Sequence, residues 1–157
     1  MPLEIEKKFR ILNDSWRQSV VGVRHIRQAY LARNDRLSLR IRVISGASAL
    51  LTMKTVGSGP TRHEYEYPIP LQDAEELIEL RQGAIITKTR HLVPQGGLTW
   101  EVDVFGGENA GLSIAEIELP DVHHAFERPD WIGEDVTHDR RFYNAELTRN
   151  PFAAWTK

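Results

Sequence analysis

The sequence predicts a mainly β fold, in which eight antiparallel strands close into a barrel with helices packed outside it and a C-terminal helix. Eight segments alternate between polar and apolar residues with a period of two, which is typical of strands. Most connections between them are short and rich in Gly, Asn and Asp, which favours antiparallel hairpins over helical crossovers. In seven of the eight segments, one face consists almost wholly of long acidic and basic side chains.

Each expected strand carries its own version of this alternation. Residues 36–45 show it most clearly, because aliphatic residues at the odd positions alternate with Ser38 and three arginines. The second strand is less charged, and Gln28 and Tyr30 share one of its faces. The expected strands are residues 3–9, 24–32, 36–45, 49–56, 61–69, 85–93, 98–105 and 112–119. Their charged faces carry, in order, Glu4, Glu6 and Lys8; Arg40 and Arg42; Lys54; Arg62, Glu64 and Glu66; Lys88 and Arg90; Glu101 and Asp103; and Glu116 and Glu118.

Turn-forming residues separate the strands, and three further segments are expected to be helical. Residues 71–81 place their apolar side chains at helical spacing. A shorter helix is expected near residues 14–21. The C-terminal residues 121–148 are expected to be helical in two pieces, broken around Pro129 and Gly133. The expected turns are residues 34–35, 45–46, 57–60, 95–97 and 106–107.

The composition excludes several classes of protein. The chain has 157 residues, of which 41% are hydrophobic and 27% charged, so we expect one folded domain over residues 1–157. It has no cysteine, which excludes disulfides, thiolate metal sites and a cysteine nucleophile. A net charge of −2 argues against nucleic-acid binding through bulk positive charge. No secretory signal or membrane-spanning run is visible, so we expect a soluble cytoplasmic protein with no membrane partner.

A closed barrel would bring the charged faces together inside a narrow lumen. About eight strands leave a lumen that side chains or one small ligand can fill. Crowding eight acids and seven bases there is costly unless ions complete the set. A chain of phosphates bridged by divalent cations would satisfy the bases and the carboxylates together. Because the donors are oxygens, with no cysteine and no histidine cluster, Mg²⁺ or Mn²⁺ is favoured over Zn²⁺.

The alternative is that each charged face is simply the solvated face of an open sheet. A single E-x-E or R-x-R segment is common on exposed strands and would carry no functional meaning. Independent solvated faces would not repeat the pattern on seven strands, however, so the repetition favours the lumen.

Short motifs follow one another in a fixed order through nearly the whole chain. The first is the E-x-E-x-K sequence Glu4-Ile5-Glu6-Lys7-Lys8. The others are Gln28-Ala29-Tyr30-Leu31, Leu39-Arg40-Ile41-Arg42, Thr52-Met53-Lys54, Arg62-His63-Glu64-Tyr65-Glu66, Lys88-Thr89-Arg90, Glu101-Val102-Asp103, Glu116-Ile117-Glu118, and Val136-Thr137-His138-Asp139 with Arg141 and Asn144. This ordered set resembles the CYTH superfamily, also called triphosphate tunnel metalloenzymes, although Phe142 stands where that family often has tyrosine.

The resemblance implies an eight-stranded antiparallel tunnel, dependence on Mg²⁺ or Mn²⁺, and a small-molecule substrate that contains a triphosphate. It implies that phosphates are bound by Lys8, Arg40, Arg42, Lys54, Arg62, Lys88 and Arg90. It implies that metal is held by Glu4, Glu6, Glu64, Glu66, Asp103, Glu116 and Glu118. Glu6 is the candidate general base for the attacking water, and Glu101 is either a ligand or an ion-pair partner.

The leading hypothesis is metal-dependent hydrolysis of inorganic triphosphate, because the chain is most similar to the compact bacterial members with that activity. One alternative is another enzyme of the family, either a class IV adenylate cyclase or a nucleoside or thiamine triphosphatase. The second alternative is a non-catalytic module that binds polyphosphate or nucleotide. No base-reading motif supports a cyclase, and a pure anion binder would need the bases but not eight carboxylates. A homodimer is also left open.

Overall fold

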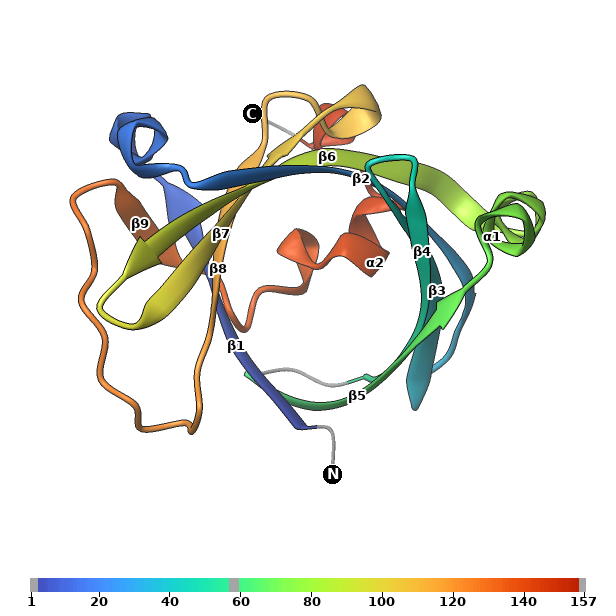
Figure 1. The fold of residues 1–157 in the computed structure, drawn as a ribbon, viewed down its shortest axis with the longest axis horizontal. Helices are drawn as coiled ribbons and strands as arrows, with labels where there is room; N and C mark the ends of the chain where they lie inside the picture. The colour runs from blue at the N-terminus through green and yellow to red at the C-terminus, as the bar shows by residue number, and fades with distance from the viewer. Residues whose placement is uncertain (1–2, 57–59, 156–157) are drawn as a thin grey trace.

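Eight antiparallel strands close into a barrel in the computed structural model, which describes residues 3–56 and 60–155. Viewed down its axis, the barrel is a ring whose wall runs from β5 through β2, β6 and β8 to β1 (Figure 1). Its strands are β1 (Leu3–Ile11), β2 (Gly22–Arg33), β3 (Leu37–Ile44), β4 (Ser48–Thr55), β5 (Thr61–Ile69), β6 (Gln82–Gln95), β7 (Leu98–Phe105) and β8 (Ser113–Glu118). The predicted barrel and its eight strands are confirmed. Most of the expected turn at residues 57–60 lies outside the described residues.

Strand β1 closes the ring, because its two edges pair with different strands. On one edge Glu4 lies opposite Arg62 of β5, and on the other Lys8 lies opposite Glu116 of β8. Directly opposed residues of an antiparallel pair project from the same face of the sheet. The register therefore brings the charged rows of β1, β5 and β8 onto one side of the wall.

The prediction of helix in the first part of residues 121–148 is wrong. Residues 121–131 form no helix, and β9 (Ile132–Asp135) pairs with β1 at Phe9 and Ile11. Since β5 covers only the first part of that edge of β1, the remaining backbone groups need other partners. The segment from β9 onward supplies them, and the Lys8 amide also donates to Thr137 Oγ1 at 3.0 Å. The hydrogen bonds gained by pairing β9 with this edge of β1 stabilise the segment more than its weak helical pattern would.

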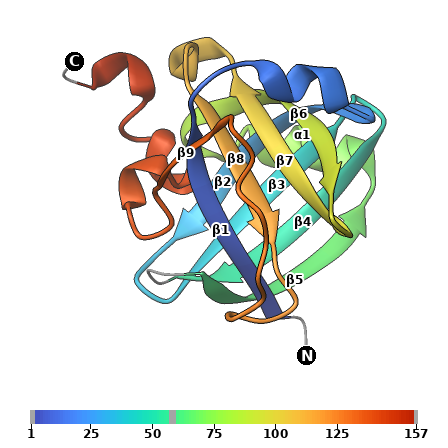
Figure 2. The same ribbon diagram turned by 90° about the vertical axis from the view of Figure 1, so that its left-hand side faces the viewer.

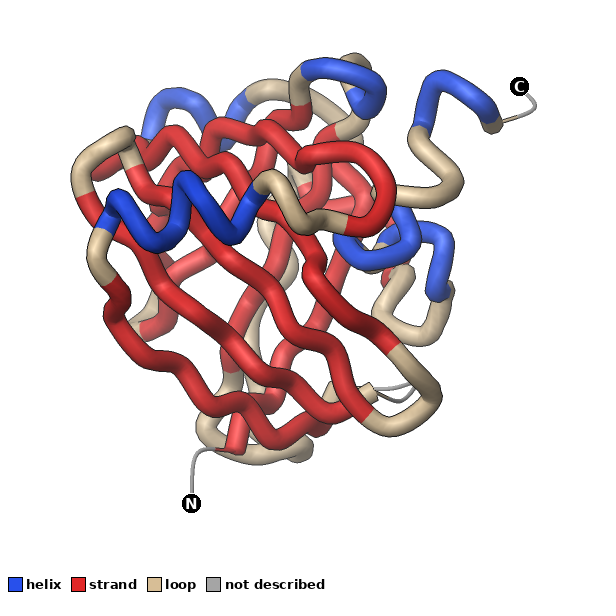
Figure 3. The backbone as a smooth tube through the Cα atoms, turned by 90° about the vertical axis from the view of Figure 1, so that its right-hand side faces the viewer, coloured by secondary structure: helices blue, strands red, loops and turns tan. Residues whose placement is uncertain are grey.

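Helix α1 (Leu71–Ile78) packs on the outer wall of the barrel, as predicted. Its Ala74 and Ile78 are buried against Ile41 and Val43, which project outward from β3. Figure 3 shows the helix lying across the strands on this side of the molecule. The arginines of β3 alternate with these aliphatic residues, so covering the outer face directs the arginines into the lumen.

The opposite outer wall is covered by aromatic residues rather than by a long helix. Phe9 and Trp100 pack edge to face with ring centroids 5.5 Å apart, and Trp131 packs against Trp100. The short helix expected near residues 14–21 is a 3₁₀ helix, Ser15–Ser19, whose tryptophan is buried. No helix among the described residues is long and apolar enough to cross a membrane.

The C-terminal segment lies at one end of the barrel rather than on its outer wall (Figure 2). It contains the 3₁₀ helix Arg140–Phe142 and the four-residue helix α2 (Asn144–Leu147). Phe142 and Leu147 are buried with three barrel residues that share the faces of the charged rows, namely Ile86, Phe105 and Ile114. The C-terminal helix is thus present but short. It departs from the expectation that helices pack outside, because its apolar residues fill part of the lumen.

Candidate active site

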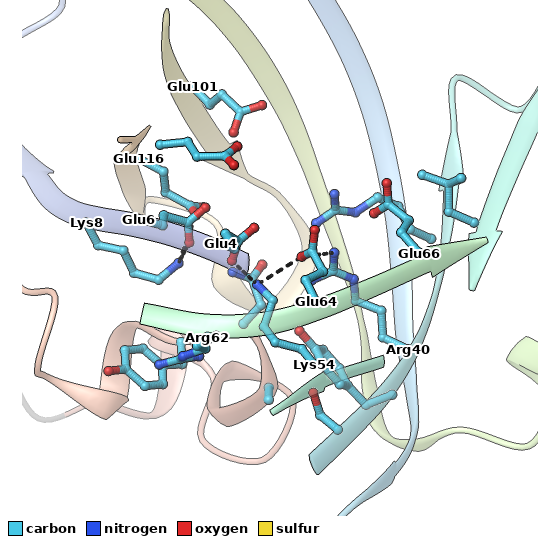
Figure 4. A pocket seen from close by; sticks show the side chains of 18 of the residues that line it. Glu4, Glu6, Lys8, Arg40, Lys54, Arg62, Glu64, Glu66, Glu101 and Glu116 are labelled. Atoms are coloured by element: carbon cyan, nitrogen blue, oxygen red, sulfur yellow. Dashed lines mark ion pairs between the residues drawn. The ribbon is translucent and has the colours of Figure 1, made fainter. Parts of the chain in front are cut away.

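The lumen holds a cavity of about 250 Å³ with a wall of mainly charged and polar side chains, and we call it the tunnel cavity. Side chains from opposite walls of the barrel point into it and toward one another (Figure 4). Twelve of the fourteen predicted site residues line it: Glu4, Glu6, Lys8, Arg40, Arg42, Lys54, Arg62, Glu64, Glu66, Arg90, Glu116 and Glu118. Glu101 also lines it, whereas Lys88 and Asp103 do not.

Lys54 connects two carboxylates from different strands at the centre of the cavity. Its Nζ lies 2.9 Å from Glu4 Oε1 and 3.4 Å from Glu64 Oε2 (Figure 4). The Arg40 guanidinium lies 4.0 Å from the same Glu64 carboxylate. Burial acts to raise the pKa of Glu4, but the ammonium of Lys54 outweighs it and lowers that pKa. The bases of β3 and β4 therefore neutralise the acids of β1 and β5.

A second cluster joins β1, β6 and β8 around Glu116. Its carboxylate lies 3.1 Å from Lys8 Nζ and 3.4 Å from Arg90 Nη2. Burial acts to raise the pKa of Glu116. The positive charge of Lys8, a hydrogen bond with Glu6 and the positive charge of Arg90 together hold that pKa well below the usual range. Burial and the negative charge of Glu116 raise the pKa of Glu6 well above the usual range. Glu6 therefore keeps its proton to a higher pH than Glu116 does.

Lys88 and Asp103 form a buried ion pair behind the cavity wall. Lys88 Nζ lies 2.8 Å from Asp103 Oδ2, and neither side chain is exposed. Arg90 donates to both oxygens of the same carboxylate, at 2.8 and 2.9 Å. Burial, aided by Arg90 and Arg42 and opposed by Asp103, lowers the pKa of Lys88 to about 7. The structure brings both residues to the site but uses them to hold Arg90, which itself reaches the cavity.

Arg62 is braced by the C-terminal segment. Its guanidinium carbon lies 4.6 Å from the centre of the Tyr143 ring, and the Tyr143 hydroxyl donates to the Thr137 carbonyl at 2.7 Å. The aromatic face stabilises the cation and limits its rotamers. Arg62 therefore has a defined position at the edge of the cavity before any substrate arrives.

Comparison with known proteins is consistent with this arrangement of charges. Residues 2–143 match the CYTH domain family. The chain belongs to the CYTH family. It is 45% identical over 153 residues to an inorganic triphosphatase of Acetivibrio thermocellus, covering 97% of each chain. It is 36% identical over 149 residues to an inorganic triphosphatase of Nitrosomonas europaea, covering 92% of this chain and 95% of the relative.

The barrel is also similar to a solved CYTH structure. The crystal structure of the inorganic triphosphatase NE1496 superposes with a TM-score of 0.68 at 31% identity, covering 92% of this chain and 93% of that one. The predicted resemblance to the CYTH superfamily is thereby confirmed. CYTH triphosphatases form a metal-dependent class of enzyme.

The donor set of this CYTH tunnel fits a hard divalent cation. The cavity is lined by several glutamates and by no histidine, which is the oxygen-rich chemistry that such cations prefer. Within residues 3–56 and 60–155, however, no three acidic or imidazole side chains are grouped closely enough to hold a metal. The carboxylates are held instead by lysine and arginine, as the contacts of Lys54 and Lys8 show. A cation must therefore compete with these ammonium groups for its ligands.

Sequence reasoning missed several residues that line the cavity. Arg24 shares a face with Gln28 and Tyr30, so the period of the second strand was a sufficient signal for it. Arg33 had no such signal, because a bulge between Tyr30 and Ala32 shifts the register and places it opposite Ser38. Three consecutive residues of the C-terminal segment also reach the cavity: Tyr143, Asn144 and Ala145.

We expect Asp103→Asn to lower the free energy of unfolding by about 3–5 kcal/mol at neutral pH. The substitution leaves Lys88 and Arg90 without the carboxylate that compensates them, and breaking a buried ion pair has effects of about this size. Urea denaturation followed by circular dichroism measures the change. Asp130→Asn, at an exposed site, is the matched control and should change stability by less than about 0.5 kcal/mol. Equal stability of the two variants would contradict the assignment.

Proposed function

We propose that this CYTH protein hydrolyses inorganic triphosphate, cleaving a phosphoanhydride bond in the tunnel cavity with Mg²⁺ or Mn²⁺. The observation that carries the proposal is that cations from six strands and carboxylates from four converge on one cavity about the size of a small anion. The triphosphatase activity of the two relatives, at 45% and 36% identity, supports the same substrate.

The substrate would bind by replacing carboxylates as the partners of the bases. Arg40, Arg42 and Arg62 present guanidinium groups to phosphate oxygens, with Lys8, Lys54 and Arg90 adding charge around them. Phosphoryl transfer depends mainly on such positioning and on stabilising charge in the transition state. Lys88 and Asp103 contribute by fixing the orientation of Arg90 rather than by contacting phosphate.

The same exchange would free the carboxylates to hold the metal. Once Lys54, Lys8 and Arg90 turn to phosphate, Glu4, Glu64 and Glu116 are released, and Glu66 and Glu118 line the same cavity. A bound divalent cation supplies Lewis acidity and lowers the pKa of a coordinated water. Glu6 is the general base in this proposal, since a raised pKa places a carboxylate closer to the pH at which proton transfer is efficient.

A phosphate-release panel tests the proposal. We expect the highest kcat/KM with inorganic triphosphate, because the cavity offers charges for phosphates and no apolar pocket for a base. ATP and thiamine triphosphate should be slower. Pyrophosphate should be at least tenfold poorer, because two phosphates cannot engage both clusters of bases. Each substrate is assayed with Mg²⁺, with Mn²⁺ and with EDTA.

Other outcomes would replace the proposal with a named alternative. Formation of cyclic AMP from ATP would assign a cyclase. Faster hydrolysis of ATP or thiamine triphosphate than of inorganic triphosphate would assign a different triphosphatase. Triphosphate binding without phosphate release under any metal would assign a non-catalytic module.

A further inference from the structure

Asn144 stands where the C-terminal segment meets the tunnel cavity, and no role was assigned to it from the sequence. It is the first residue of α2, is only 9% exposed, and lines the cavity beside Tyr143. We propose that its side-chain amide donates a hydrogen bond to a phosphate oxygen of the bound substrate, as an uncharged member of the phosphate-binding set. The inference rests on the proposed function, because it takes the ligand to be a short chain of phosphates.

The orientation of the Asn144 amide is determined by its neighbours. Its Oδ1 accepts hydrogen bonds from Lys88 Nζ at 2.9 Å and from Gln28 Nε2 at 3.0 Å. The Arg42 guanidinium can only donate, and its Nε donates to Gln28 Oε1, so Gln28 presents its Nε2 to Asn144 and the Asn144 atom that faces it must be the oxygen. The Arg42–Gln28 distance is 2.9 Å, and Lys88 is the second donor to the same Asn144 oxygen. The hydrogen bonds from Arg42 through Gln28 to Asn144, which we call the relay, can therefore run in only one direction.

This orientation leaves the Nδ2 group of Asn144 as an available donor. Because Oδ1 faces Lys88 and Gln28, the amide nitrogen points away from them, and no partner is recorded for it among the described residues. The Nδ2 atom is not fully buried, so it is open to the space around it. Since Asn144 lines the tunnel cavity, that space is the one the phosphates would occupy.

An anion is the ligand that would best supply an acceptor for the Asn144 Nδ2 group. An amide N–H₂ needs an acceptor, and hydrogen bonds to charged acceptors are stronger than those between neutral groups. Arg42, two residues along the relay, lines the same cavity, so one phosphate chain can engage both. The amide adds a donor without adding another positive charge to a region where burial and Arg40 already lower the pKa of Arg42 to about 10.

Asn144→Asp tests the proposal without breaking the relay. The carboxylate has the shape of the amide and still accepts from Lys88 and Gln28, but it cannot donate. The matched control is Ala145→Asp, which adds the same charge to the next residue of the cavity wall and keeps the Asn144 amide. Thermal unfolding shows that both variants fold. Binding of inorganic triphosphate is measured by calorimetry in EDTA, and kcat/KM is measured with Mg²⁺.

We expect Asn144→Asp to weaken triphosphate binding and lower kcat/KM by at least tenfold, and by at least fivefold more than Ala145→Asp does. Equal losses in the two variants would show that only the added charge matters and would overturn the proposal. So would binding within twofold of the wild type, since a purely structural Asn144 tolerates aspartate. The calorimetric comparison needs no turnover, so absence of phosphate release in the wild type would contradict the proposed function and leave this test intact.

Discussion

Glu116→Gln should abolish metal-dependent hydrolysis of inorganic triphosphate, and it should also destabilise the metal-free protein. The ionised carboxylate is the shared partner of Lys8 and Arg90, at 3.1 and 3.4 Å, and its side chain is only 6% exposed. Removing one member of a buried charge cluster costs about 3 kcal/mol, because the remaining charges lose their compensation. Activity should fall at least a thousandfold, since the amide is a weaker ligand for a hard cation than a carboxylate.

Glu6→Gln is the informative comparison, because the pKa of this neighbouring carboxyl is shifted in the opposite direction. Burial and the charge of Glu116 raise the pKa of Glu6, so in the metal-free protein the uncharged carboxyl, which an amide imitates, persists to a higher pH than in the unfolded chain. Between the ordinary pKa of glutamate and this raised value, the folded protein binds more protons than the unfolded one, so this group makes stability fall as pH rises. Glu6→Gln removes that dependence and should match or exceed wild-type stability at neutral pH, while turnover is lost.

Activity and urea denaturation of the two variants, both without metal and at saturating Mg²⁺, separate the two roles. Full activity of Glu116→Gln at low Mg²⁺ would show that this carboxylate is not a ligand. A Glu6→Gln variant as unstable as Glu116→Gln would contradict the opposite directions of the two pKa shifts.

Arg40→Ala should lower kcat/KM for inorganic triphosphate about a hundredfold. Arg40 is buried, and its only ion pair within 4.0 Å among the described residues is with Glu64. Its Nε is a buried donor without a partner within the described part of the chain. A buried donor in this state is costly, and a phosphate oxygen is the acceptor that would satisfy it. Losing such a charge-assisted contact in the transition state costs about 3 kcal/mol, which corresponds to about two orders of magnitude in rate.

Arg27→Ala is the matched control for Arg40→Ala. Arg27 is an arginine of the adjacent strand, but it does not line the tunnel cavity and pairs with Glu75 of α1 on the outer wall. Its replacement should leave kcat/KM within twofold of the wild type. If Arg40→Ala behaves like this control, the Arg40 guanidinium does not contact the phosphates. Arg42 and Arg62 would then be the main phosphate-binding arginines.

The ring of strands and most of the residues that line the tunnel cavity were determined by the sequence alone. In β3, covering Ile41 and Val43 with α1 forces Arg40 and Arg42 to the opposite face, and this follows from a period of two. The same local rule, applied to each strand, predicted that the charged rows face inward. It works because the outer wall must be apolar to bury against helices and loops, whatever the details of the packing.

The tertiary structure decided what depends on contacts between distant segments. β9 exists because part of one edge of β1 is not covered by β5, a fact that no pattern within residues 121–148 contains. Arg33 reaches the cavity through a bulge, which reverses the alternation beyond it.

Tertiary packing also determines which charged residues line the cavity and which are buried behind its wall. Lys88 has the same parity as Arg90, yet apolar residues of the C-terminal segment fill the lumen beside it, and it pairs with Asp103 and Asn144 instead of facing the cavity. A period of two tells which side of a strand a residue faces. How far along the strand the lumen stays open is set by what else packs into it, and here residues from the far end of the chain do so.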